Sequence, residues 1–257
     1  MKPSLLLFTG LSLLMGACKK DSITCTDPAP AIETPCQCLK ENIGVPPINP
    51  IACYGFFNLT NYMQQNTNEM SSSVQATAYF YNQATTQITG DHLINVDSVS
   101  FNQVFQDSLK DANGQHMYYH SFQSSWPTTQ QWQVYGNNGI PSFTAKVNVQ
   151  TPTADFSQLP TQLSKSLLKA FSLNSVNNTT RASATLFKSG VSGPNTSIIV
   201  KPGNNQLCFP SEWVSRIDTG KATLMIELEN LEIHDFGNKQ FAFVKTLQFT
   251  KEIQLNP

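Results

Sequence analysis

Three glutamates lie close together near the carboxyl end, namely Glu227, Glu229 and Glu232. Two of them could act as a pair of catalytic carboxylates. They interrupt an apolar run from Leu224 to Ile233, which is typical of a strand with one buried and one solvent-exposed face. A change of phase at Asn230 predicts a β-bulge. We therefore expect these glutamates to be solvated, and we assign no catalytic residue. A hydrolase built from scattered residues stays as an alternative.

Two histidines four positions apart, His116 and His120, are the next candidates because imidazole is a common metal ligand. The surrounding aromatic residues favour a strand, on which residues four apart are separated by about 13 Å. That spacing is too wide for one ion. We expect no metal site and no cofactor.

The cysteines fall into three groups. Cys25, Cys36, Cys38 and Cys53 crowd into one proline-rich stretch and are disulfide candidates, with Cys36 and Cys38 too close for an easy mutual bridge. A zinc site is the alternative, although their spacing lacks a pair of C-x-x-C motifs. Cys208 is left over and is expected to be a buried apolar residue. The third group is Cys18.

Exposed aromatic rings could bind sugars, whose apolar faces stack on them. Trp126 precedes Pro127 in an expected loop, so it is the candidate for ligand stacking. Trp132 lies in an alternating stretch and is expected to fill a core.

The first eighteen residues predict where in the cell the protein is located. One positive charge at Lys2 precedes an apolar run from Leu5 to Met15, too short to cross about 30 Å of hydrocarbon and typical of a signal peptide. The run ends in Met15-Gly16-Ala17-Cys18, which resembles the lipobox of bacterial lipoproteins. The resemblance implies cleavage after residue 17 and lipid attachment at Cys18, so that the membrane is a partner through this anchor. An ordinary secretory signal is the alternative. Lys19, in place of aspartate, favours the outer membrane by the same resemblance.

The rest of the chain predicts an all-β fold, made of two tandem immunoglobulin-like β-sandwich domains after a Cys/Pro-rich tether. Alternating apolar residues begin at Val74 and recur at short spacing, with turns such as Asn137-Asn138-Gly139 and Asp235-Phe236-Gly237-Asn238. A short helix is a further possibility at 57–70, inside the tether. The segment from Phe241 carries Lys245 and Lys251, a pattern typical of an edge strand. The expected divisions are a signal peptide (1–17), a tether (18–73), domain 1 (74–150), a linker (151–160) and domain 2 (161–257).

The net charge of the chain argues against one class of partner. The chain has 16 basic and 17 acidic residues, and loss of Lys2 with the signal peptide changes the net charge from −1 to −2. Nucleic acid is therefore not an expected partner. We expect a non-catalytic binding or assembly lipoprotein of the cell envelope, with a glycan or an outer-membrane protein as its partner. The alternative is a structural subunit of a surface fibre, similar in plan to the fimbrillins, although their maturation cuts after an early arginine and the first arginine here is Arg181.

Overall fold

The computed structural model describes residues 51–65, 69–86, 88, 92–110, 116–122, 126–127, 129–164, 170–188, 196–200, 206–208 and 217–257. Within these ranges the chain forms strands and no helix, which confirms the all-β class. The first strands are β1 (Cys53–Gln65), β2 (Met70–Thr85), β3 (Ser98–Phe101), β4 (Val104–Phe105), β5 (Asp107–Lys110), β6 (His116–Phe122), β7 (Gln130–Tyr135) and β8 (Phe143–Val147). They are followed by β9 (Thr153–Asp155), β10 (Gln162–Ser164), β11 (Ala170–Ser172), β12 (Asn174–Asn177), β13 (Arg181–Phe187), β14 (Thr196–Val200), β15 (Gln206–Cys208), β16 (Gly220–Phe236) and β17 (Lys239–Asn256).

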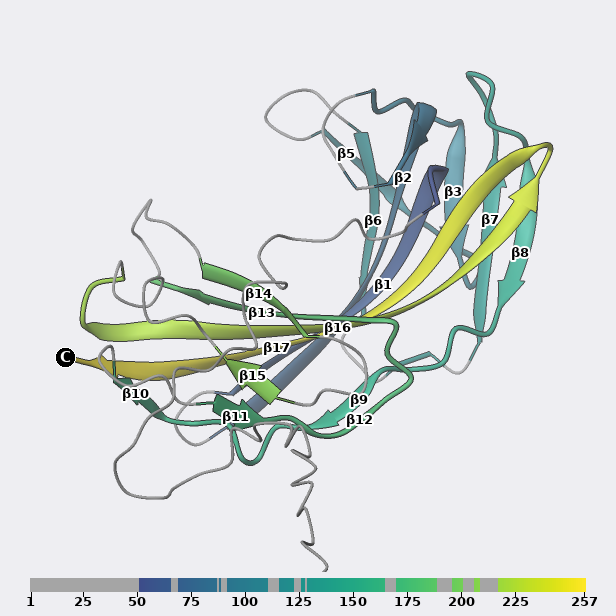
Figure 1. The fold of residues 1–257 in the computed structure, drawn as a ribbon. Coiled ribbons are helices and arrows are strands. Elements are labelled where there is room, and N and C mark those ends of the chain that lie inside the picture. Colours follow the sequence, from purple (N-terminus) through teal and green to yellow (C-terminus); the bar gives the residue numbers. More distant parts are fainter. Residues whose placement is uncertain are drawn as a thin grey trace, which may run out of the picture.

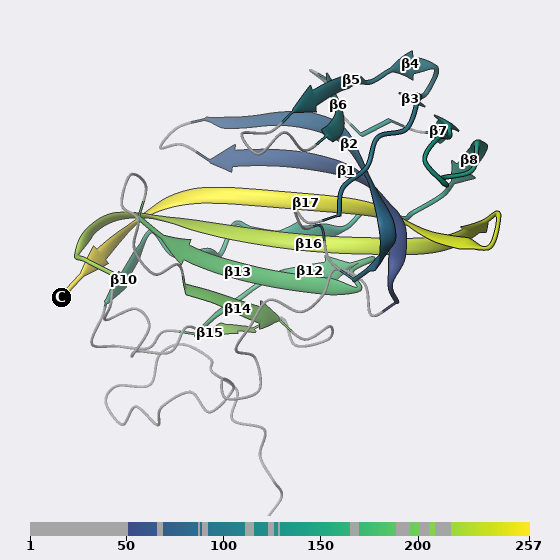
Figure 2. The same ribbon diagram turned by 90° about the horizontal axis from the view of Figure 1, so that it is seen from above.

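One large sheet organises the molecule. Its order is β14-β13-β16-β17-β1-β2-β6-β5, with β10 pairing the far end of β17. A four-stranded sheet, β4-β3-β7-β8, lies against one half of it, and two short pairs, β11-β15 and β9-β12, complete the described strands. Both views show the β16–β17 hairpin running the length of the fold, with its tip beside β8 (Figures 1 and 2).

The tip of this hairpin was predictable from sequence. Gly237 (φ 57°) and Asn238 (φ 65°) both adopt positive φ, as a two-residue type I′ turn requires, and this turn matches the twist of the strands it joins. From Phe236↔Lys239 to Gly220↔Leu255 the register then continues without a shift. The predicted bulge at Asn230 is therefore wrong.

The alternation of apolar residues changes at Asn230 for another reason. The face of the hairpin that is buried in a core changes along its length. One face of the large sheet carries two cores. The first core lies under the four-stranded sheet and includes Phe57, Trp132, Phe241 and Phe243. The second core lies toward the other end of the hairpin, around Phe249.

A third, smaller core lies on the opposite face of the sheet. It includes Phe56, Tyr81, Ala242 and Val244, and Leu231 packs against it. Because β17 contributes alternate residues to both faces, Phe241 and Phe243 reach the first core while Ala242 and Val244 reach the third. A strand that is buried on both faces loses the simple alternation on which sequence reading depends.

The predicted tether requires correction, because residues 53–65 form β1 in the middle of the sheet. β1 runs parallel to β17, from Gly55↔Phe241 to Gln65↔Lys251, and antiparallel to β2. The helix considered at 57–70 is likewise wrong. Asparagines made this stretch look irregular, yet Asn58 accepts a hydrogen bond from Thr246 Oγ1 (3.0 Å) and Asn61 accepts one from Ser72 Oγ (2.7 Å).

The tandem arrangement also differs from the expectation. Strands β2, β5 and β6, from predicted domain 1, share the large sheet with β13, β14, β16 and β17 from predicted domain 2. The first core is sandwich-like, but its second layer includes the β16–β17 hairpin. The segment from Phe241 is therefore a central strand and not an edge, with β16 on one side and β1 and β10 on the other.

The shared hairpin predicts a single cooperative unfolding transition. We expect Phe57→Ala in the first core and Phe249→Ala in the second to lower the midpoint of the same transition, each costing about 3–5 kcal/mol because a large cavity is left. Urea unfolding followed by tryptophan fluorescence and by circular dichroism checks this. Two separate transitions, each shifted by only one variant, would contradict it.

Candidate functional site

The cysteine candidates are located only in part. Cys18, Cys25, Cys36 and Cys38 lie outside the described residues, so lipid attachment and the disulfide set remain predictions. Cys53 begins β1 and is fully buried in the third core, with Sγ 3.6 Å from the carbonyl oxygen of Ile51.

Trp126 lies at the seam between the two larger cores. Its side chain is half-buried and contacts both of them. The ammonium of Lys245 lies 5.3 Å from the centre of the indole ring and donates a hydrogen bond to Thr151 Oγ1 (3.0 Å). Lys245 is itself buried, and this burial lowers the pKa of its amine. Trp126 is thus a packing residue that shields a buried cation, and it is a poor platform for a ligand.

Trp132 fills the first core as predicted, with 1 % of its surface exposed. His116 and His120 lie on β6, as the strand prediction requires. In the described part of the chain, no group of three or more His, Cys, Asp or Glu side chains is placed to hold a metal ion.

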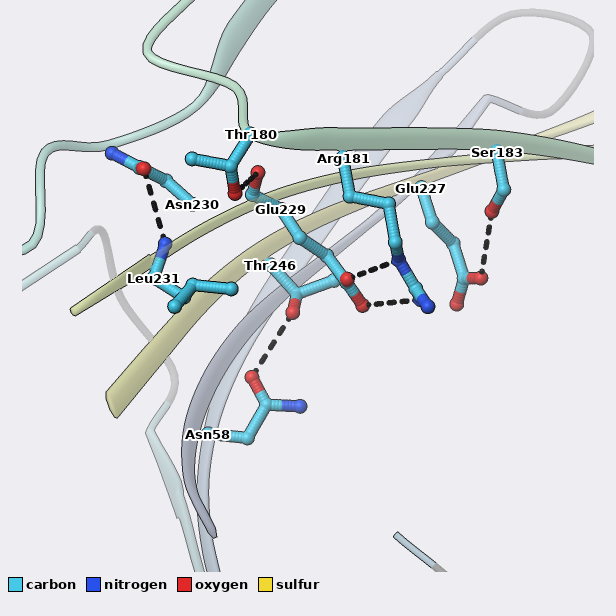
Figure 3. A network of polar contacts seen from close by, with 9 residues as sticks. All are labelled: Asn58, Thr180, Arg181, Ser183, Glu227, Glu229, Asn230, Leu231 and Thr246. Carbon is cyan, nitrogen blue, oxygen red and sulfur yellow. Dashed lines mark hydrogen bonds and ion pairs between the residues drawn. The ribbon is translucent and has the colours of Figure 1, made fainter. Parts of the chain in front are cut away.

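A polar stripe crosses the face of the large sheet that carries the third core. We define it by Asn58, Thr246, Glu229, Glu227, Arg181 and Ser183 (Figure 3). Their cross-strand partners explain the arrangement, since Arg181 pairs with Glu229, Ser183 with Glu227, and Glu229 with Thr246. Side chains from four neighbouring strands therefore meet in one row.

An ion pair anchors this stripe. Arg181 Nη2 donates to Glu229 Oε1 at 2.9 Å, and Arg181 Nε lies 2.5 Å from Oε2. Ser183 Oγ donates to Glu227 Oε2 at 3.3 Å, and Thr180 Oγ1 donates to the backbone carbonyl of Glu229 at 3.1 Å. The contacts join the start of β13 to β16 with a fixed geometry.

Glu229 differs from the solvated glutamate that its sequence context predicted, because only 6 % of it is exposed. Burial raises the pKa of Glu229 to about 7, while the Arg181 guanidinium opposes that rise and the neighbouring Glu227 adds to it. A buried ion pair of this kind fixes geometry more reliably than it adds stability. We interpret the stripe as structural, since its carboxylate is bound to a guanidinium rather than directed at an open site.

An exposed aromatic pair lies elsewhere, on the outer face of the four-stranded sheet. Phe105 is 61 % exposed and Tyr135 is 41 % exposed. Their ring centres are 6.3 Å apart and their planes differ by 27°. Because the two exposed rings lie next to each other, they form an apolar patch, and such patches commonly mark the site of a ligand or partner. We call Phe105 and Tyr135 the aromatic platform.

The strand pattern places these two rings together. Ser100 of β3 lies opposite Phe105 on one side and Gln133 on the other, and Ser98 lies opposite Tyr135. The residues under the rings are therefore small. Gln133 Nε2 donates to the Tyr135 hydroxyl at 2.9 Å, which holds that ring in position.

A tight turn holds the Phe105 strand on the sheet. Asn102 (φ 47°) and Gln103 (φ 70°) join β3 to β4, both with positive φ. The Asn102 side chain accepts a hydrogen bond from Gln131 N (2.9 Å) and donates one to the Thr129 carbonyl (2.8 Å). These bonds fix the backbone of the turn from which the strand of Phe105 starts.

Sequence reading missed both platform residues. Both residues end stretches whose alternation predicts a strand, and the alternation assigned neither of them a role at the surface. Asn102 tolerates positive φ, but Gln103 lacks the glycine that marks a two-residue hairpin, so little in the sequence indicates the turn that reverses which face the following residues occupy.

Comparison with protein-family models, with curated proteins and with solved structures gives no match for this chain. Among the described residues, none of the elements is a helix of the length and apolar character that crossing a membrane requires. The residues themselves must therefore carry any functional argument.

The raised pKa of Glu229 predicts a pH dependence of stability. The folded state keeps a proton on Glu229 that the unfolded chain releases near its ordinary pKa of 4.5. The contribution of this group to stability is thus complete below pH 4.5 and is lost as the pH rises toward 7.

The measurement is the urea midpoint at pH 5 and at pH 8. We expect the Glu229→Gln variant, which cannot titrate, to show a smaller difference in stability between the two pH values than the parent chain. It should lose the counter-charge of Arg181 only at pH 8, where Glu229 of the parent is ionised. An unchanged pH slope in the variant would contradict the assignment to Glu229.

Proposed function

We propose that this protein is a lipid-anchored module of the bacterial outer membrane that binds a glycan without chemically altering it. The observation that carries the proposal is the aromatic platform, two exposed rings fixed on a rigid sheet. The resemblance to a lipobox at Cys18 supports the proposed attachment to the outer membrane. Trp126, the earlier candidate for stacking, is replaced in this role by Phe105 and Tyr135.

The chemistry of the platform suits a sugar. The C–H groups on one face of a pyranose pack against an aromatic ring, while its hydroxyl groups need amide or hydroxyl partners close by. Gln133 and the Tyr135 hydroxyl supply such partners beside the rings. Preorganisation by the Asn102 turn reduces the entropic cost of binding.

The proposal that the module does not catalyse a reaction follows from what surrounds the rings. Glu229, the most buried carboxylate among the described residues, is bound to Arg181 on the large sheet, outside the four-stranded sheet that carries the platform. Sugar binding at the platform involves stacking and hydrogen bonds, without a paired acid and base at the rings.

The anchor is tested with Cys18→Ser. Two or more acyl chains make membrane attachment stable, so we expect the parent chain to remain with the membrane fraction after a high-salt wash and to incorporate a palmitate analogue. The variant should lose the label and leave the membrane. A Cys25→Ser variant serves as a control. Equal labelling of all three chains would contradict lipid attachment at Cys18.

The platform is tested by affinity electrophoresis through gels that contain immobilised neutral or acidic polysaccharides. We expect Phe105→Ala and Tyr135→Ala each to weaken retardation about tenfold, equivalent to about 1.4 kcal/mol. Val104→Ala is the matched control, because Val104 is 41 % exposed on the same strand and is paired with the core residue Phe101. If no polysaccharide retards the parent chain, or if both ring variants bind like the parent, the proposed function is wrong.

A further inference from the structure

We infer that the ligand of the aromatic platform is an uncharged oligosaccharide with at least two adjacent sugar units, one on Phe105 and one on Tyr135. This inference rests on the proposed function and adds the charge and the minimum length of the ligand. Both come from the side chains on the outer face of the four-stranded sheet.

The residues in register with the rings are neutral. On β3, β7 and β8 they carry hydroxyl or amide groups, namely Ser98, Ser100, Gln133 and Thr144. A uronate or a sulfated sugar placed here would lose water from its charge without gaining a counter-charge. Hydroxyl groups, in contrast, can exchange water for amide partners at little cost.

Charged side chains also lie near this face in the described part of the chain. Lys146 lies on the edge strand β8, opposite Gln131, and its side chain is exposed. Asp97 precedes β3 and accepts a hydrogen bond from Asn137 Nδ2 at 2.8 Å. Asp107, two residues after Phe105, is exposed as well. One lysine and two aspartates give no positive field that would select an acidic polymer.

The two rings set the minimum length. At a centre-to-centre distance of 6.3 Å, nearly parallel rings are offset from one another rather than pressed face to face. One sugar unit can cover one ring, and the next unit along a chain reaches the second.

A protein partner fits these observations less well. A stable protein interface buries about 800 Å² on each side. Two rings surrounded by amides and small hydroxyl residues offer far less apolar area. The turn at Asn102 also fixes the rings, whereas surfaces that dock many proteins are commonly adaptable.

The charge of the ligand is tested with the full chain in affinity gels that contain glucomannan, xylan or glycogen, compared with alginate or polygalacturonate. We expect retardation by at least one neutral polymer, unchanged from low to 0.5 M salt, and no retardation by the acidic polymers. Lys146→Ala should bind like the parent. Retardation by an acidic polymer that is lost in salt and in Lys146→Ala would overturn the inference, yet leave the proposed function standing if Phe105→Ala also loses it.

The length of the ligand is tested by calorimetry with oligosaccharides of one to six units from the retarding polymer. We expect affinity to rise at least tenfold between one unit and two or three units. Phe105→Ala should remove this gain while leaving the weak binding of the single sugar at Tyr135. Equal affinity for one unit and for longer chains would overturn the two-unit assignment. Absence of retardation by every polymer would instead contradict the proposed function itself.

Discussion

The rest of the structure depends on the continuous pairing of β16 with β17. This hairpin keeps its register from Gly220↔Leu255 to Phe236↔Lys239, and it provides a wall for both larger cores. The strand β17 passes from Phe243 in the first core to Leu247 and Phe249 in the second. Lys245 lies between them, at the position where neither core covers the strand with apolar residues. Its amine is satisfied by Thr151 and shielded by Trp126, so the gap between the cores is filled rather than open.

The two faces of the large sheet have different roles. One face carries the two apolar cores, while the other carries the third core and the polar stripe. The buried Arg181–Glu229 pair gives up hydration to hold the start of β13 against β16, and the raised pKa of Glu229 is the electrostatic sign of that loss. The outer face of the four-stranded sheet carries neither an apolar core nor the polar stripe. Its two exposed rings are therefore available to a ligand without a cost in folding.

The predictions from sequence were accurate where one face of a strand is exposed to solvent. The all-β class, the turn at Gly237-Asn238 and the burial of Trp132 were all predictable, because alternation and turn chemistry are local signals. The reading failed at β1, whose residues Phe56 and Phe57 are buried on opposite faces, so that no alternation marks the strand. It failed for Lys245, because an isolated charge in a strand normally indicates an edge. The platform was missed because exposure of Phe105 depends on which face the short β4 strand presents, and that is decided by the hairpin turn before it.

The parallel pairing of β1 with β17 joins the first described strand to the last described strand. A contact so distant in sequence cannot form while the chain is still incomplete, and its loop-closure entropy slows the final step of folding. The large sheet therefore lacks its centre until the carboxyl-terminal hairpin arrives. The central pairing of the sheet is thus completed last, whereas β1 with β2 and β3 with β7 can already pair among themselves.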